Sequence, residues 1–122
     1  MSGRPILVVE DSPTELLHVT QVLASKGYPY TVATDGEEAL KKAVEQRPVL
    51  LLLDITMPWM DGYEVCKNIK GKPLTKKVPV VMLSGKDGLF DKVRGKLAGC
   101  NDYITKPFDP EALLKTLRKY LS

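Results

Sequence analysis

The chain has 122 residues, of which 43% are hydrophobic and 27% are charged. This length suits one domain with one hydrophobic core, and the composition is that of an ordinary globular protein. No apolar run approaches the roughly 20 residues that a membrane-spanning helix needs, and no export signal is visible, so we expect a cytoplasmic protein without membrane insertion. The net charge of +3 is modest and accompanies no nucleic-acid-binding motif, so nucleic-acid binding is not expected.

Five short apolar runs alternate with stretches of helical period, which is typical of a parallel sheet covered by helices on both faces. The runs are Ile6–Val9, Tyr30–Ala33, 49–53, 78–83 and Asp102–Thr105. The first, the third and much of the fourth are continuously apolar, which indicates strands buried on both sides. We predict an α/β fold, a doubly wound, flavodoxin-like parallel sheet of five strands in the order 2-1-3-4-5 with five helices.

Helix-start signals follow the runs. Ser12, Pro13 and Glu15 offer an N-cap, a proline at the first helical position and a capping-box glutamate. The predicted buried stripe of this first helix consists of Leu16, Leu17, Thr20 and Leu23. Acidic caps for later helices are predicted at Asp35, Asp61 and Asp109. Cys66 and Cys100 lack both CxxC spacing and clustered histidines, which favours packing thiols over a disulfide or a metal site.

The fourth predicted helix lies around Leu89 and Leu97 and contains Gly95. Glycine lowers the stability of a helix interior, so this helix is predicted to be the weakest of the five. No linker or repeat interrupts the chain, and the sequence ends directly after the fifth predicted helix. Residues 1–122 are therefore predicted to form a single domain without an output domain.

Polar residues follow four of the predicted strands. Glu10 and Asp11 follow the first strand, Asp54 the third, Ser84 the fourth and Lys106 the fifth. In an open parallel sheet, ligands bind beyond the carboxyl ends of the strands, near the point where the strand order reverses. This edge of the sheet is the predicted functional site. Asp54 directly follows a buried strand and has no helix of its own to cap, which favours a site role for its carboxylate.

The predicted strand order brings Glu10, Asp11 and Asp54 close enough for their negative charges to repel one another. Either one carboxyl group takes up a proton or a hard divalent cation binds. An oxygen-lined site that retains waters suits Mg²⁺. Lys106 adds a further positive charge at the same edge.

These residues resemble the response-regulator receiver family over essentially the whole chain. The matching motifs are Glu10-Asp11, the segment Asp54-Ile55-Thr56-Met57-Pro58-Trp59-Met60-Asp61-Gly62, Ser84-Gly85 and Lys106-Pro107-Phe108. The resemblance implies that Asp54 is the phosphoryl acceptor. It also implies that Asp11, Asp54 and the backbone carbonyl of Thr56 hold Mg²⁺ with assistance from Glu10, and that Ser84 and Lys106 contact the phosphoryl oxygens.

The same resemblance implies a switch in which Tyr103 moves inward when Ser84 is drawn toward the phosphoryl group; the alternative is a half-exposed strand tyrosine. It further implies a cis peptide bond before Pro107, which would aim Lys106 into the site. Thr56 and Lys86 flank the acceptor at positions that tune rates in relatives. Trp59 either packs within its loop, which we favour, or provides a docking contact.

The implied function is that of a phosphorylation-dependent switch in a two-component system. A histidine kinase or phosphotransfer protein donates the phosphoryl group, and the fourth helix, fifth strand and fifth helix form the docking surface for a target protein. Such a chain is not an enzyme, apart from its own phosphoryl transfer and autodephosphorylation, and we expect a monomer or weak dimer. The alternatives are an aspartate-based phosphatase of the haloacid dehalogenase type, which normally has an acid where Thr56 stands, and a phosphorylation-independent pseudo-receiver.

Overall fold

The computed structural model describes residues 4–55, 62–84, 94, 96–106 and 108–121. The strands are β1 (Ile6–Val9), β2 (Tyr30–Ala33), β3 (Leu50–Asp54), β4 (Val80–Ser84) and β5 (Asp102–Thr105). The helices with described bounds are α1 (Pro13–Ser25), α2 (Gly36–Gln46), α3 (Gly62–Gly71) and α5 (Pro110–Leu121). Residues 94 and 96–98 are helical too. The rest of the predicted fourth helix lies outside the described residues, so its weakness stays a prediction.

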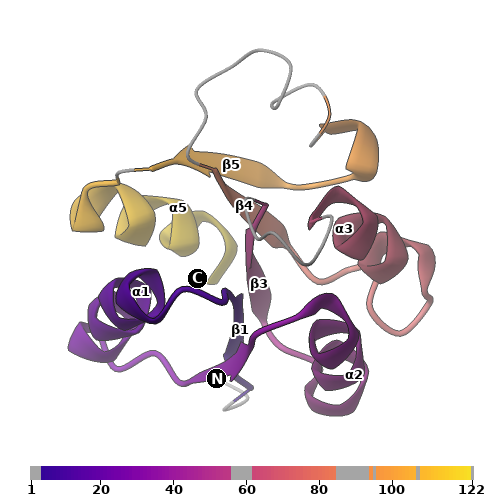
Figure 1. The fold of residues 1–122 in the computed structure, drawn as a ribbon, viewed down its shortest axis with the longest axis horizontal. Coiled ribbons are helices and arrows are strands. Elements are labelled where there is room, and N and C mark those ends of the chain that lie inside the picture. The colour runs from indigo at the N-terminus through magenta and orange to yellow at the C-terminus, as the bar shows by residue number, and fades with distance from the viewer. Residues whose placement is uncertain (1–3, 56–61, 85–93, 95, 107, 122) are drawn as a thin grey trace.

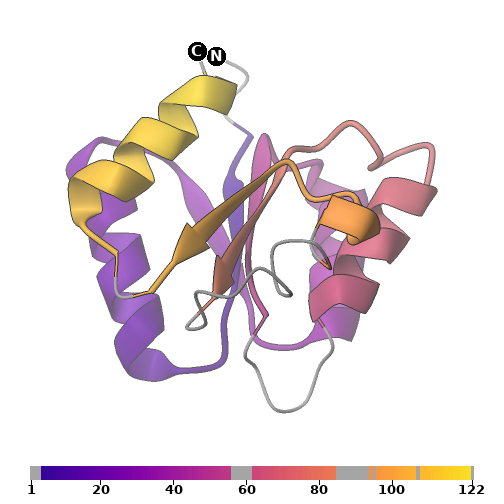
Figure 2. The same cartoon turned by 90° about the horizontal axis from the view of Figure 1, so that it is seen from above.

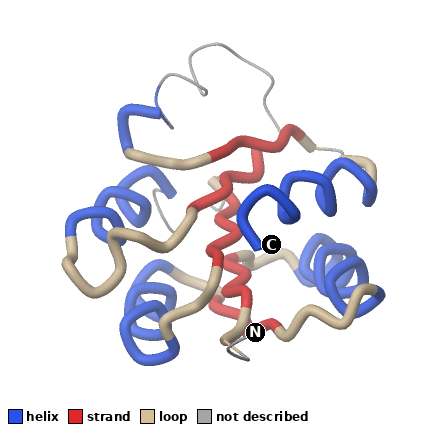
Figure 3. The backbone as a smooth tube through the Cα atoms, turned by 180° about the vertical axis from the view of Figure 1, so that it is seen from behind, coloured by secondary structure: helices blue, strands red, loops and turns tan. Residues whose placement is uncertain are grey.

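The five strands form one parallel sheet in the order β2-β1-β3-β4-β5, as predicted. Helices α1 and α5 cover one face of this sheet and α2 and α3 cover the other, with the strands between them (Figure 1). The same layering is visible from behind, where the strands run between the two sets of helices (Figure 3). The two chain ends lie together at the end of the sheet opposite the carboxyl ends of the strands (Figure 2). The doubly wound, flavodoxin-like fold is therefore confirmed.

The sheet divides the hydrophobic core into two layers, whereas the sequence predicted one core. Alternate residues of a strand face opposite sides, so Leu51 and Leu53 pack with α2 and α3. Leu50 and Leu52 pack with α1 and α5 on the other face. All four leucines are fully buried, and each contributes about 1.5–3 kcal/mol through removal of apolar surface from water.

The buried face of α1 differs from the predicted stripe. Leu17 is 58% exposed, and the buried residues of α1 are Val19, Thr20, Val22 and Leu23. Apolar residues occur on more than one side of this helix, so periodicity alone did not settle its rotation. The buried Thr20 hydroxyl donates hydrogen bonds to the carbonyls of the preceding turn, which satisfies its polar atom inside the core.

The outer edge of β2 is covered by two side chains of α2. The Pro29 and Ala33 carbonyls accept hydrogen bonds from Ile6 N and Glu10 N on the inner side of β2. Because backbone groups alternate in direction along a strand, those of Val32 and Thr34 point to the outer side, away from β1. Glu38 Oε1 accepts a hydrogen bond from Thr34 N at 2.8 Å, and Lys42 Nζ donates one to the Val32 carbonyl.

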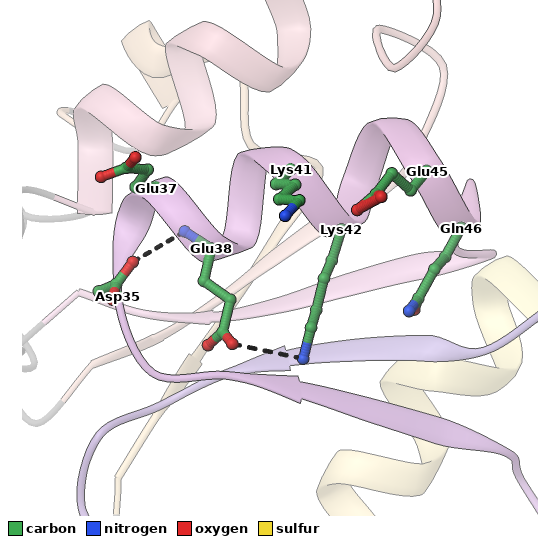
Figure 4. A pocket seen from close by; sticks show the side chains of 7 residues that line it. All are labelled: Asp35, Glu37, Glu38, Lys41, Lys42, Glu45 and Gln46. Carbon is green, nitrogen blue, oxygen red and sulfur yellow. Dashed lines mark hydrogen bonds and ion pairs between the residues drawn. The ribbon is translucent and has the colours of Figure 1, made fainter.

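The two covering side chains also pair with each other. Glu38 and Lys42 form an ion pair at 3.6 Å, seen along the polar face of α2 (Figure 4). Unpaired groups on an edge strand are a template for pairing with another chain. We infer that the Glu38–Lys42 pair protects this edge.

Replacing both residues, Glu38→Ala with Lys42→Ala, is expected to increase self-association relative to the wild type, because two edge groups become available to a second strand. The association should be weak, no tighter than about millimolar, since each new hydrogen bond contributes only about 0.5–1.5 kcal/mol. Sedimentation velocity over a concentration series measures it. Glu64→Ala with Lys67→Ala is the matched control, because that exposed pair in α3 makes no hydrogen bond to a strand within the described part of the chain. Equal association of both double variants would contradict the role of the pair.

Candidate functional site

The register of the sheet gathers the predicted site residues at one edge. Val9 pairs with Leu53, Leu83 with Asp54, and Ser84 with Thr105. Glu10 and Lys106 directly follow β1 and β5, so they lie at the same edge. Asp54 and Ser84 are themselves the last residues of β3 and β4, so each strand ends one residue later than the apolar run predicted from the sequence.

Lys106 is the centre of the charge arrangement. Its Nζ atom lies 2.7 Å from Asp54 Oδ2, 2.9 Å from Glu15 Oε2 and 3.6 Å from Glu10 Oε1. Burial of the ammonium lowers its pKa, but the hydrogen bonds to Asp54 and Glu15 and the charges of Asp54 and Glu10 outweigh this effect, so the pKa stands above its usual value. Lys106 is therefore a fixed cation at the carboxyl edge of the sheet.

Glu10 is almost completely buried, with 1% of its surface exposed. Burial, together with the neighbouring Asp54 carboxylate, raises the pKa of Glu10 from 4.5 to about 8. Two carboxyl groups this close titrate as a pair. In the metal-free chain, the raised pKa favours retention of one proton by the Glu10–Asp54 pair near neutral pH.

One oxygen of Glu10 is left without a hydrogen bond. Glu10 Oε2 accepts one from Ser12 N at 3.2 Å, whereas Oε1 has no hydrogen-bond partner within the described part of the chain. A buried, unsatisfied carboxylate oxygen is costly unless something else binds it. Its position among other carboxylates makes it a candidate ligand atom for a cation.

The acidic cluster at this edge includes Glu15, which the sequence indicated as a helix-capping residue. Carboxylate oxygens of Glu10, Glu15 and Asp54 all lie within 4.8 Å of one another. Glu15 was predicted as a capping-box residue, and Asp11, a predicted metal ligand, is not a member of this cluster among the described residues. Lys106, which follows the last strand, was the one available signal, because a lysine there needs acidic partners. The sequence could not identify Glu15 as a partner, since the two residues are 91 positions apart.

The residues present fit a hard divalent cation. Carboxylate oxygens are the ligands that Mg²⁺ prefers, and the cluster offers three acids together with the unsatisfied oxygen of Glu10. Among the described residues, Lys106 contributes one positive charge against the three acids of the cluster. The observed acidic cluster thus supports the magnesium site expected from the charges.

The other predicted residues have mixed outcomes. Ser84 is fully buried, and Tyr103 is half-buried and packs against the core layer formed with α2 and α3. Cys66 and Cys100 are free thiols, as predicted. The remaining predicted residues lie outside the described residues: Thr56, Trp59, Asp61, Lys86 and Pro107. Their roles stay predictions.

None of the helices described in this chain is both long enough and apolar enough to span a membrane.

A family model, the response regulator receiver domain, matches residues 6–118. The chain belongs to the response-regulator receiver family. Protein PilG of Pseudomonas aeruginosa is 40% identical to this receiver over 119 residues, which are 98% of this chain and 88% of PilG. The resemblance inferred from the motifs is thereby confirmed.

Two solved structures extend the likeness to the fold. Chemotaxis protein CheY4 of Vibrio cholerae has 37% sequence identity and a TM-score of 0.90, covering 96% of this receiver and 98% of CheY4. The receiver domain of sensor histidine kinase PA1611 from Pseudomonas aeruginosa has 33% identity and a TM-score of 0.89, covering 98% of both chains. That structure contains a magnesium ion in its active-site cleft.

Family membership settles the class of function. The receiver is a phosphorylation-dependent signalling module of a two-component system, and neither the haloacid dehalogenase-type phosphatase nor the pseudo-receiver alternative is favoured.

Proposed function

We propose that Asp54 is the phosphoryl acceptor of this receiver. The observation that carries the proposal is the ion pair at 2.7 Å between the buried Asp54 and the partly buried Lys106, surrounded by further acids at the carboxyl edge of the sheet. A carboxylate is a nucleophile toward phosphorus, and Lys106 is a cation at the place where negative charge develops on the transferring group.

The reaction is transfer from a phosphohistidine on a partner kinase or phosphotransfer protein. The phosphorus–nitrogen bond of the donor breaks while a phosphorus–oxygen bond to Asp54 forms, and water later hydrolyses the acyl phosphate. Ser84 and Lys106 contact the phosphoryl oxygens. The chain thus catalyses its own phosphorylation and dephosphorylation but acts on no other substrate.

We further propose that Glu10, Asp11, Asp54 and the backbone carbonyl of Thr56 hold Mg²⁺. The unsatisfied Oε1 atom of Glu10 and the acidic cluster support this site, and the magnesium ion in the PA1611 receiver is a precedent within the family. When bound, the ion offsets the negative charge that spreads over the phosphoryl oxygens.

The output is a change of docking partner. Phosphorylation biases a two-state equilibrium through Ser84 and Tyr103, and the surface of the fourth helix, β5 and α5 then binds a target protein. A shift from 1:99 to 99:1 needs about 5.5 kcal/mol of differential stabilisation. The likeness to the chemotaxis protein CheY4 over nearly its whole length supports action by docking in a chemotaxis or twitching-motility pathway of the cytoplasm, as a monomer or weak dimer.

The proposal is tested by intact mass after incubation with Mg²⁺ and acetyl phosphate. The wild type is expected to gain one phosphoryl group, and Asp54→Asn is expected to gain none because an amide is a poor nucleophile. Chelation of Mg²⁺ should suppress the gain in the wild type. A stable gain of equal size in both proteins would show that another residue is the acceptor.

A further inference from the structure

The first turn of α1 departs from the capping arrangement that its sequence indicates. In a complete capping box, the N-cap side chain accepts from the third helical residue, and the glutamate at that residue reaches back to the N-cap N–H. Ser12 Oγ does accept from Glu15 N, at 3.5 Å. The reciprocal bond is replaced, because Ser12 N donates to Glu10 Oε2 instead.

This replacement leaves the Glu15 carboxylate available for another partner. Glu15 Oε2 accepts a hydrogen bond from Lys106 Nζ at 2.9 Å, across the gap between α1 and the end of β5. The Lys106 side chain is 11% exposed, that of Asp54 is 1% exposed and that of Glu15 is 43% exposed. Lys106 is therefore held between Asp54 on its buried side and Glu15 on its solvent side.

We propose that Glu15 is a positioning residue that shares the Lys106 ammonium with Asp54 before phosphorylation and competes for it with the incoming phosphoryl oxygens. This inference rests on the proposed role of Asp54 as acceptor. Glu15 places a negative charge at the open side of the site. That charge attracts a metal cation and repels an anionic phosphodonor, so it acts in opposite directions on the two ligands.

The test is Glu15→Gln, which keeps the size and the hydrogen-bonding oxygen of the side chain but removes its charge. Mg²⁺ affinity, measured by isothermal titration calorimetry without a donor, is expected to fall about two- to fivefold, the size typical of a partly exposed charge. The phosphorylation rate with acetyl phosphate at saturating Mg²⁺, followed by intact mass, is expected to rise by a similar factor of about two to five.

Glu37→Gln is the matched control, since Glu37 lies in the first turn of α2 and is exposed. It removes the same charge from the same part of a helix, and Glu37 has no hydrogen bond or ion pair to Lys106 among the described residues, so both readouts should stay at the wild-type level.

The two readouts separate positioning from general damage. A poorly folded Glu15→Gln protein would lose both Mg²⁺ affinity and phosphorylation rate, and that pattern overturns the proposal, as does an unchanged rate. Equal effects of Glu37→Gln also overturn it, because the charge would then act without contact to Lys106. A wild type that gains no phosphoryl group at Asp54 contradicts the proposed function instead.

Discussion

Replacing Lys106 with methionine is expected to lower the free energy of unfolding by about 3 kcal/mol when Mg²⁺ is absent, the cost typical of breaking a buried ion pair. The buried Asp54 loses its 2.7 Å partner, and Glu10 and Glu15 lose the same cation. Methionine retains most of the apolar stem of the lysine side chain, so the decrease in the free energy of unfolding arises from the lost charge more than from lost packing. Urea unfolding in the presence of a chelator measures the change.

Saturating Mg²⁺ should restore most of the stability of Lys106→Met, because a cation bound to the folded chain alone stabilises it by mass action. Lys119→Met is the matched control, since Lys119 pairs with Asp102 at 3.2 Å but is 57% exposed. The control should lose at most about 1 kcal/mol and gain little from Mg²⁺ beyond the wild type. Losses of equal size in the two variants would mean that Lys106 does not balance buried charge.

Binding of Mg²⁺ is expected to strengthen by up to about 50-fold between pH 6 and pH 8, because the ion displaces the proton shared by Glu10 and Asp54. Burial and the neighbouring Asp54 raise the pKa of Glu10 from 4.5 to about 8. Below that pKa, each pH unit changes the apparent affinity almost tenfold. Calorimetric titrations in buffers of different ionisation enthalpy measure both the affinity and the proton release.

The stability of the metal-free protein should change in the opposite direction. Since the folded chain binds the Glu10 proton more tightly than the unfolded chain, the stabilisation is complete below about pH 4.5 and is lost as the pH rises through about 8. Glu10→Gln removes the titrating group and should flatten both pH profiles. Profiles that keep their slope in Glu10→Gln would assign the proton to another residue.

The fold was predictable because its signals are local. Continuous apolar runs identified the central strands, and the two more polar runs, Tyr30–Ala33 and Asp102–Thr105, are the edge strands of the sheet. The rotation of α1 was not fully predictable, because Leu17 continues the apolar pattern beyond the face that packs on the sheet, whereas Leu16 packs against the core. Which of several apolar faces a helix buries depends on the neighbouring helix, here α5, and not on its own period.

The site was predictable only where residues follow strands. Glu10, Asp54, Ser84 and Lys106 end or follow parallel strands, and topology alone brings them together. Glu15 was missed because its contact with Lys106 depends on how the first turn of α1 sits beside β5. A local capping motif explained the same residue equally well, and only the competition of Glu10 for the Ser12 N–H decides between the two arrangements.

The four successive leucines of β3 leave the alignment of that strand undetermined by hydrophobicity. Moving the chain along by one residue would exchange Leu50 and Leu52 for Leu51 and Leu53 between the two layers, with leucine still filling each layer. Asp54 ends this ambiguity, since its carboxylate meets the Lys106 ammonium only in the native alignment. Asp54, the proposed phosphoryl acceptor, therefore also fixes the register of the central strand.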